Sequence, residues 1–212
     1  TYKLDRFYIT LPKSNFLSSF FFSFNRKYPL LKGFFFPSSR LIIENEDQLN
    51  SNVSEFFPPS NLKEKTLFYQ GYWQHINFLS IRKVLLSELR FNLPPNSVFE
   101  EIKAKIQASE AVCLHVRRMQ YSRLLTLDYY RAAVSILEKS CTAPCFFIFS
   151  DDLAWCRERL SISYSCVYID NFDDELYELQ LMSFCHHFII ANSSFSWWGA
   201  WLSQHPDKMV IL

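Results

Sequence analysis

The 212-residue sequence contains only 3 glycines and no apolar run long enough to cross a bilayer. A Gly-rich loop that cradles phosphates needs several glycines close together, so the sequence excludes that class of nucleotide site. A transmembrane helix needs roughly 20 consecutive apolar residues. The Phe-rich segment Phe20–Phe24 is shorter than that, because Ser23 interrupts it and Asn25-Arg26-Lys27 follows it.

Metal-binding motifs and excess charge are also missing. Neither Asp-x-Asp nor Cys-x-x-Cys occurs, and the formal net charge is +1. The near-neutral charge gives no indication of a nucleic-acid partner. His186 and His187 are adjacent at the end of a predicted helix, and on a helix neighbouring side chains point to different faces and make a poor chelate. We therefore expect no metal site, and arginines must neutralise any bound diphosphate.

The 6 cysteines are scattered, and several lie inside apolar runs. We expect buried free thiols, which favours a reducing compartment, although an even number leaves disulfides open. The chain begins on Thr1-Tyr2-Lys3 and ends on the apolar segment Met209–Leu212. From these ends we expect a fragment of a longer protein.

The C-terminal half alternates between short apolar runs and amphipathic segments, which is typical of a parallel sheet covered by helices on both faces. The predicted strands are Val112–Val116, Phe146–Phe149, Cys166–Ile169, Phe188–Ala191 and Lys208–Leu212. The predicted helices are Asp128–Lys139, Asp152–Leu160, Asp173–His186 and Ser194–Gln204. The sequence therefore predicts an α/β fold with a doubly wound parallel sheet in this half.

The N-terminal half has a weaker pattern. Short strands are expected at Phe7–Ile9, Arg40–Glu44 and Thr66–Gln74, and a helix at Phe78–Phe91. The proline pair after this helix ends it, and Pro94–Ser97 is the predicted linker. We expect a partial N-terminal domain over residues 1–95 and a second domain over residues 96–212.

Polar side chains gather directly after the predicted strands. They are Arg117-Arg118, Ser150-Asp151-Asp152, Asp170-Asn171 and Asn192-Ser193-Ser194. Right-handed crossovers bring the carboxyl ends of parallel strands to one edge, where open α/β sheets bind ligands. Two guanidinium groups at that edge suit phosphate oxygens. The alternative is a pair of surface arginines in structural ion pairs.

The segment after the fourth predicted strand completes this hypothesis. A helix that begins near Ser194 directs free backbone N–H groups at the strand edge, and with the arginines it forms a cradle for a diphosphate. Ser194 is alternatively a simple helix cap. The cluster of Trp197, Trp198 and Trp201 favours helix–sheet packing over a sugar platform. Gly199 inside the helix indicates close packing.

Several of these segments, in this order, resemble motifs of the α-1,2-fucosyltransferase family. The segment His115-Val116-Arg117-Arg118-Met119-Gln120-Tyr121 is similar to the family's His-x-Arg-Arg-x-Asp-Tyr. Further similar blocks are Gly71-Tyr72-Trp73-Gln74, Leu127-Asp128-Tyr129-Tyr130, Phe149–Cys156 and Asn192–Trp201. Because several motifs occur together, the resemblance is far more specific than the arginine pair alone.

The resemblance implies two facing Rossmann-type halves of the GT-B kind, here with an incomplete N-terminal half. It implies inverting, metal-independent transfer of fucose from GDP-fucose to a galactose-type hydroxyl of a glycan acceptor, without a cofactor. Arg118, with Arg117, would neutralise the leaving GDP, and His115 would orient the loop or the donor. The implied substrate-binding residues are Ser193, Ser194, Asn192, Asp151, Asp152 and Tyr121, although both aspartates are equally suited to cap the next helix.

Two departures from the family pattern keep other functions open. Met119-Gln120 replaces the usual Gly-Asp, and Gln120 cannot act as a base. The family's N-terminal Gly-Gly-x-Gly-Asn-Gln segment does not occur. The chain could therefore be a degenerate relative that only binds a nucleotide sugar or a partner, or a sugar-binding module that uses its tryptophans. Bacterial relatives imply a cytoplasmic or peripheral-membrane location, and animal relatives a Golgi membrane.

Overall fold

The computed structural model describes residues 6–9, 39–43, 66–70, 81–119, 125–170 and 172–212, with only the backbone course for 39–43 and 66–70. The chain divides into two compact units, Tyr2–Arg90 and Phe91–Leu212. In the first unit, strands β1 (Ser39–Ile43) and β2 (Thr66–Gln70) pair in parallel. Helix α3 spans Arg82–Glu88, within the predicted helix. Phe7 forms an isolated bridge in place of the expected strand.

The second unit contains a five-stranded parallel sheet. Its strands are β3 (Glu110–Val116), β4 (Pro144–Ser150), β5 (Ser165–Ile169), β6 (His187–Ile189) and β7 (Val210–Ile211). The spatial order is β5-β4-β3-β6-β7, and every neighbouring pair is parallel. The predicted α/β class and parallel sheet are confirmed. The pairing of two GT-B halves stays a prediction.

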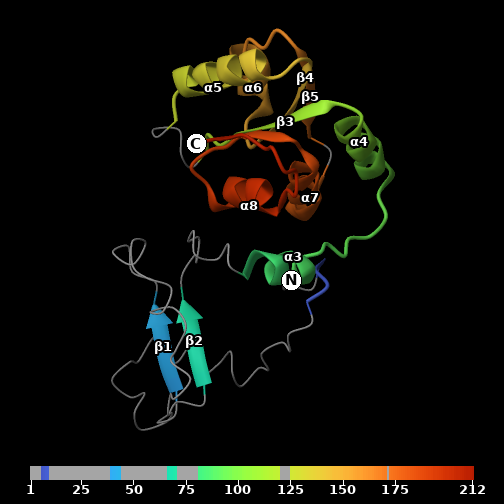
Figure 1. Cartoon of the computed structure of the whole chain (residues 1–212). Coiled ribbons are helices and arrows are strands. Elements are labelled where there is room, and N and C mark those ends of the chain that lie inside the picture. The colour runs from blue at the N-terminus through green and yellow to red at the C-terminus, as the bar shows by residue number, and fades with distance from the viewer. Residues whose placement is uncertain (1–5, 10–38, 44–65, 71–80, 120–124, 171) are drawn as a thin grey trace. The chain divides into compact units, whose positions relative to one another are not determined.

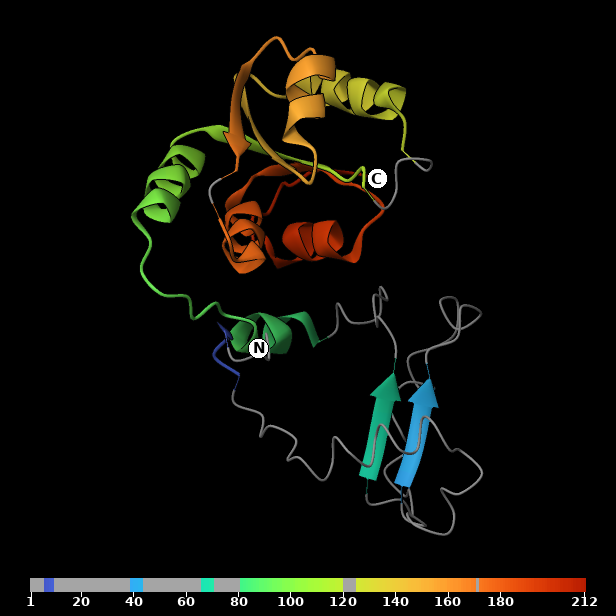
Figure 2. The same cartoon turned by 180° about the vertical axis from the view of Figure 1, so that it is seen from behind.

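Helices cover both faces of this sheet (Figures 1 and 2). Helices α5 (Leu127–Ser140) and α6 (Leu153–Arg159) lie on one face. Helices α7 (Glu175–Phe184) and α8 (Ser194–Leu202) lie on the other. Each helix follows a strand and runs back across the sheet, so the helices begin near the carboxyl edge and end near the amino edge. This order confirms the doubly wound arrangement.

Helix α4 (Ser97–Gln107) is an addition to the predicted elements. Asn96 caps it by accepting the Phe99 amide at 3.0 Å. Phe99, Ile102 and Ile106 are buried at spacings of three and four residues, the pattern of one helix face. The predicted linker thus runs directly into a helix whose apolar face joins the core.

The core has one apolar cluster on each face of the sheet. The middle of strand β4, Phe146–Phe149, is fully buried because helices cover both faces. Burial of each large apolar side chain contributes about 1.5–3 kcal/mol. This packing of the sheet partly explains the abundance of phenylalanine.

All six cysteines are free, four of them buried and two half-buried.

The structure corrects the expectation for His186 and His187 and confirms the one for Gly199. Helix α7 ends at Phe184 and His187 opens strand β6, so the expectation that His186 and His187 share a helix is wrong. At Gly199, an added Cβ would lie 2.9 Å from Met182 Sδ. The expected close packing of this glycine is therefore confirmed, with helix α7 as the neighbour.

Candidate functional site

The order of the strands reverses between β3 and β6. The chain proceeds from β3 outward through β4 to β5, and then returns to the other side of β3 as β6. In open α/β sheets, ligands bind outside the carboxyl ends of the strands at such a switch point. The residues that follow β3 and β6 are Arg117-Arg118 and the segment around Ser193. The topology therefore brings these two predicted groups to one crevice.

Asp151 fixes the backbone of the loop that follows β3. Its carboxylate accepts the Arg118 amide at 2.9 Å and the Met119 amide at 3.2 Å. The Arg117 Nε lies 3.5 Å from Asp151 Oδ2. Hydrogen bonds from backbone N–H groups to a carboxylate are strong, since one partner is charged. Asp151 therefore anchors the backbone at Arg118 and Met119.

The two arginines occupy different surroundings. Arg117 lines a pocket. Arg118 lies over the ring of Trp155 at 4.0 Å, and its Nε is 3.4 Å from Asp152 Oδ2. Neither buried Nε makes a hydrogen bond to another described residue. Both arginines are in ion pairs and both are partly exposed, but of the two only Arg117 lines this pocket.

Asp152 has the helix-capping role that was one of its two predicted alternatives. Its Oδ1 accepts the Trp155 amide at 3.0 Å, and its own amide donates to Ser150 Oγ at 2.9 Å. Asp152 does not border the pocket, whereas Asp151 and Ser150 do. Of the two predicted aspartates, Asp151 is thus the one that lines this pocket.

His115 is buried at the end of β3, with 2% of its surface exposed. Its Nδ1 is hydrogen-bonded to Ser196 Oγ, and its ring packs against Phe195 with the ring centres 5.7 Å apart. Burial, helped by the nearby Arg117 charge, lowers the pKa of His115 to about 4. The imidazole is therefore neutral near pH 7 and acts as a hydrogen-bonding group there.

A pocket of about 370 Å³ opens at this edge of the sheet. Its lining consists of His115, Arg117, Ser150, Asp151, Glu175, Glu178 and Phe195. Three carboxylates and one guanidinium make it a pocket of mixed charge rather than a purely cationic one. Burial and the neighbouring Glu175 raise the pKa of Glu178 to about 7, against the opposing effect of Arg117.

The start of helix α8 lies beside this pocket, since Phe195 belongs to its first turn. Ser193 is the N-cap residue, but its side chain makes no capping hydrogen bond. Ser194 and Asn192 are exposed. The first backbone N–H groups of a helix have no partner within the helix. The hydroxyl of Ser193 and these amides are therefore placed to bind an anion.

The structure thus places the predicted residues in three groups. His115, Arg117 and Asp151 border the pocket, with Asn192, Ser193 and Ser194 next to it at the start of α8. Arg118 and Asp152 form a neighbouring ion pair. Tyr121 and Gln120 lie outside the described residues.

The tryptophans of α8 do not form the expected packing against the sheet. Trp197, Trp198 and Trp201 are half-buried and pack on one another, with ring centres 5.0 to 5.9 Å apart. They belong to neither core cluster of the described residues; Phe195 and Ala200 pack there instead. Full burial of the three rings would have argued against a sugar-binding role. Because they are partly exposed, that role stays open.

The sequence named Ser150 among the polar side chains at the strand ends and Phe195 within a motif, but it did not single out Glu175 and Glu178. The two glutamates lie three positions apart in the first turn of α7, so they share one face. Helix α7 leaves β5 at the edge of the sheet and leads to β6 beyond β3. The acidic first turn of this crossover helix was the sequence signal that could have identified the two glutamates.

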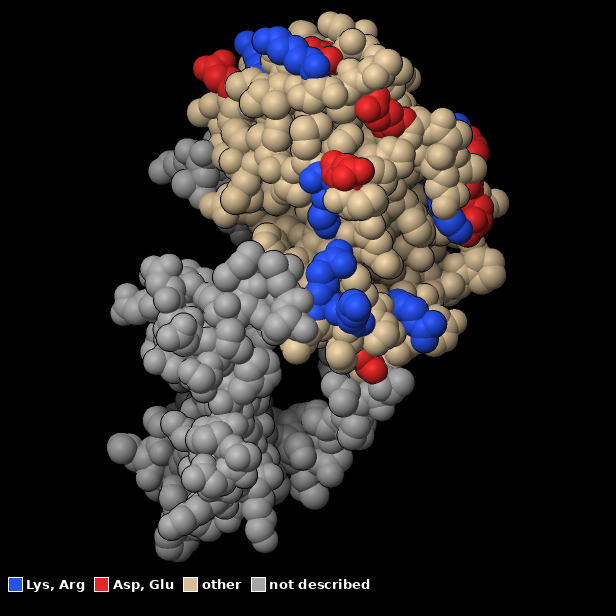
Figure 3. Space-filling model, in the orientation of Figure 1, with Lys and Arg blue, Asp and Glu red and all other residues tan. Residues whose placement is uncertain are grey.

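Outside the pocket, charges of both signs are scattered over the visible face of the described residues (Figure 3). None of the helices in the described part of the chain has the length and apolar character needed to span a membrane.

A doubly wound parallel sheet with a polar pocket at its switch point defines the class of α/β domains that bind ligands at the carboxyl edge. Comparison with known proteins gives the family. A model described as Glycosyl transferase family 11 matches residues 26–211, so the chain belongs to this family, and the predicted α-1,2-fucosyltransferase family is confirmed.

The similar proteins are themselves glycosyltransferases. An alpha-1,2-colitosyltransferase of Escherichia coli is 33% identical over 154 residues, which cover 66% of this chain and 53% of that protein. A galactoside 2-alpha-L-fucosyltransferase, SEC1 of Bos taurus, is 28% identical over 107 residues, which cover 45% of this chain and 29% of that protein. The chain thus spans about half, or less, of the length of these curated relatives.

Solved structures give a partial likeness. POFUT1 in complex with GDP matches with a TM-score of 0.45 and 15% identity, over 76% of this chain and 59% of that one. NodZ alpha-1,6-fucosyltransferase soaked with GDP-fucose matches with a TM-score of 0.45 and 12% identity, over 75% and 60%.

Proposed function

We propose that this chain is the donor-binding part of an inverting α-1,2-fucosyltransferase that moves fucose from GDP-fucose to a galactose-type hydroxyl of a glycan. The observation that carries the proposal is the pocket at the switch point, where Arg117 and the start of helix α8 border the same space. Membership of the family supports the reaction class.

The anionic end of the donor fits the side of the pocket formed by Arg117 and α8. A guanidinium offers a planar fork of donors to phosphate oxygens. The free amides and positive dipole end of α8, with the unused Ser193 hydroxyl, add further donors. Because Arg117 lines this pocket, we propose Arg117 as the main contact of the diphosphate, whereas the resemblance to the family implied Arg118, with Arg117 nearby.

The acidic side of the pocket suits the hydrogen-bond donors of a nucleoside or sugar. Glu178 is largely buried and its pKa is raised to about 7, so its carboxylate gains from any ligand that donates hydrogen bonds to it. Ribose hydroxyls and the guanine N–H groups are such donors. A mixed-charge pocket therefore matches a nucleoside diphosphate better than it matches inorganic phosphate.

The proposed transfer breaks the bond between fucose C1 and the β-phosphate oxygen while the acceptor hydroxyl forms a new bond to C1 from the opposite face. GDP leaves with the bonding electron pair, and Arg117 stabilises its growing charge. The acceptor proton passes to a base. His115, neutral and bound to Ser196, orients the end of β3 rather than exchanging this proton.

The remaining parts of the proposal are supported by the resemblance to the family alone. They are a GT-B pair of Rossmann-type halves, a diphosphate held by arginines instead of a metal, and a glycan acceptor bound with help from the N-terminal half. The proposed location, likewise from the family, is cytoplasmic or peripheral to the membrane for a bacterial protein and the Golgi membrane for an animal one.

Calorimetry with GDP tests the pocket. We expect GDP to bind at a 1:1 ratio in buffer without divalent cations, and added Mg²⁺ to change the Kd by less than about twofold. ADP and inorganic phosphate should bind more weakly. The absence of GDP binding by a folded sample, or binding that requires Mg²⁺, would contradict the proposal.

Turnover separates an active enzyme from the alternative of a degenerate relative that only binds the nucleotide sugar. Incubation with GDP-fucose and a galactoside should release GDP and form a fucosylated product. GDP binding without either product would support the non-catalytic alternative, for which the replacement of Gly-Asp by Met119-Gln120 is the motive.

Transfer of colitose is a second candidate, because a relative that covers 66% of this chain is named a colitosyltransferase. A competition between GDP-fucose and the corresponding colitose donor, read out by product mass, decides between the two sugars.

A further inference from the structure

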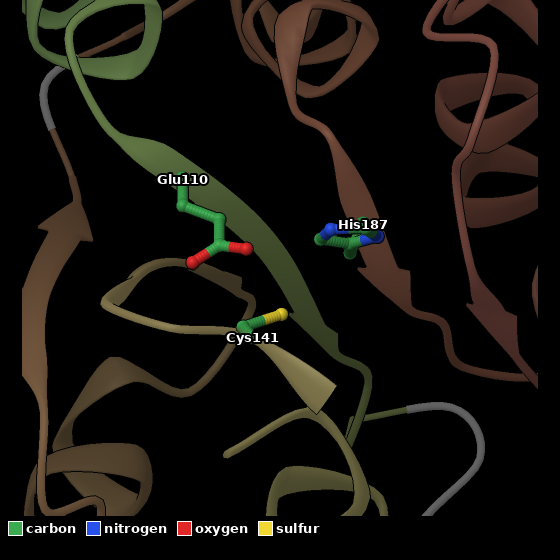
Figure 4. A group of neighbouring side chains, drawn as sticks. All are labelled: Glu110, Cys141 and His187. Carbon is green, nitrogen blue, oxygen red and sulfur yellow. The ribbon is translucent and has the colours of Figure 1, made fainter. Parts of the chain in front are cut away.

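The opposite edge of the sheet carries a cluster that the proposed function does not use. Glu110 opens strand β3, Cys141 is the C-cap residue of α5, and His187 opens strand β6. Their side chains point toward one another (Figure 4). One oxygen, the sulfur and one ring nitrogen all lie within 4.8 Å of each other. Three distant segments of the chain thus bring three metal-ligating atoms together.

The position of this cluster favours a cation. Helix α5 ends at Ser140, with Cys141 as its C-cap residue, and α4 ends just before β3 begins. Unpaired carbonyl groups give a helix C-terminus a partial negative charge. The amino edge of the sheet therefore has the opposite polarity to the edge at which the helices begin.

A transition-metal ion displaces the proton of a cysteine thiol when it binds, so Cys141 would take part as a thiolate.

We propose that Glu110, Cys141 and His187 bind one divalent transition-metal ion of the zinc class, in a structural role. A thiolate, an imidazole and a carboxylate are the ligand types that Zn²⁺ takes. One thiolate and one carboxylate neutralise a divalent ion, so the loaded centre has no net charge to bury. A monovalent ion would leave a net negative charge.

The geometry requires only small movements. With zinc–ligand bonds of about 2.0–2.3 Å, tetrahedral ligand atoms lie roughly 3–4 Å apart. Cys141 is 8% exposed, but Thr142 and Ala143, which follow it, are exposed and give the ion access. A water molecule completes the fourth position from that side.

Two existing hydrogen bonds define which atoms serve as ligands. Glu110 Oε2 accepts the Ala143 amide at 2.9 Å, which leaves Oε1 for the ion. His187 Nδ1 accepts the Met209 amide at 3.2 Å, which leaves Nε2. Metal binding at Nε2 moves the ring proton to Nδ1, so the Met209 amide loses its acceptor. This exchange makes Met209 a reporter of occupancy.

Cobalt spectroscopy on the full chain is the primary test. After metal removal, Co²⁺ should bind at one equivalent per chain and give a thiolate-to-cobalt charge-transfer band with intense tetrahedral visible absorption. Cys141→Ser should abolish the charge-transfer band, and His187→Gln should weaken Co²⁺ binding at least tenfold. Cys166→Ser is the control, because it removes a free, half-buried thiol that lies outside the cluster.

Two measurements on the unsubstituted chain do not depend on the folding of a variant. Zn²⁺ at a hundredfold excess over its Kd should raise the Tm by about 5–10 °C. In NMR spectra, Zn²⁺ should shift the Met209 amide and the His187 ring nitrogens. The proposal is overturned if folded wild-type chain gives no cobalt–thiolate band, if the band persists in Cys141→Ser, or if Zn²⁺ leaves Met209 unshifted. An unshifted Met209 amide would mean that the three side chains form only a hydrogen-bonded cluster.

Discussion

The two edges of the five-stranded sheet differ in what they collect. At the carboxyl edge, Arg117, Asp151 and Glu178 border an open pocket of about 370 Å³. At the amino edge, Glu110, Cys141 and His187 form a compact cluster. Helices begin near the first edge and end near the second, so the dipole ends favour anions at one and cations at the other. The shared direction of the strands and helices thus favours anions at the carboxyl edge and cations at the amino edge. The individual side chains then determine which ligand each edge binds.

The largest expected effect is at the carboxyl edge. Arg117→Ala should weaken GDP binding by about 10- to 100-fold, because hydrogen bonds to charged groups contribute about 1.5–3 kcal/mol. Arg118→Ala should weaken it by only about threefold, since Arg118 pairs with Asp152 and stacks on Trp155. Calorimetry on both variants, with melting curves to verify folding, measures the difference. A greater loss in Arg118→Ala would reverse the assignment.

The next effect concerns the buried support of the pocket. Ser196→Ala leaves the Nδ1 of His115 without its partner and should lower the free energy of unfolding by about 1–3 kcal/mol. Ser194→Ala, at an exposed position on the same helix, should change it by less than about 0.5 kcal/mol while it weakens GDP binding. Urea denaturation and calorimetry give the two readouts. Equal stability of the two variants would remove the supporting role of Ser196.

Glu178 gives a pH-dependent prediction. Its pKa is raised in the folded chain to about 7 from an ordinary 4.5, so its contribution to stability is present below about pH 4.5 and is lost as the pH rises through 7. Glu178→Gln should therefore be more stable than wild type at pH 8, by about 1–2 kcal/mol after allowance for partial exposure, and equally stable at pH 4.5.

Denaturation at both pH values measures this effect, with Glu158→Gln as the control, because Glu158 is an exposed residue on α6. Glu178→Gln should also bind GDP more weakly at pH 8. A variant that loses stability at pH 8 would show that Glu178 has a compensating partner within the chain.

The smallest expected effect tests whether the two edges of the sheet bind their ligands independently. Glu110→Gln should leave the Kd for GDP unchanged within about twofold, because a strand of seven residues, roughly 20 Å, lies between Glu110 and the pocket. The amide oxygen still accepts from Ala143, so stability without metal should fall by about 0.5 kcal/mol or less. A large loss of GDP affinity would mean that the edges are coupled.

The sequence was informative where the pattern was local. The alternation of apolar runs predicted the five strands of the second unit and four of its helices, because buried parallel strands and amphipathic helices leave different periodicities. Helix α4 carried the same signals, with Asn96 as cap and Phe99, Ile102 and Ile106 on one face, but it followed directly on the expected linker.

The site was predictable only in part. His115, Arg117 and Asp151 follow or end strands, so the rule that ligands bind at the carboxyl edge is sufficient to group them. Glu175 and Glu178 come from a helix that crosses the sheet, and their proximity to Arg117 depends on the path of that crossover. The different surroundings of Arg117 and Arg118 depend on Trp155 and on the two aspartates after β4.

By itself, the sequence determined the α/β class, the parallel sheet of the second unit and the family, because strand and helix periodicities and ordered motifs are properties of contiguous residues. Only the tertiary structure decided which arginine borders the pocket, that the pocket has mixed charge, and that Glu110, Cys141 and His187 meet. These facts depend on contacts between residues far apart in the chain, and such contacts are fixed by the order in which the strands pack rather than by spacing along the sequence.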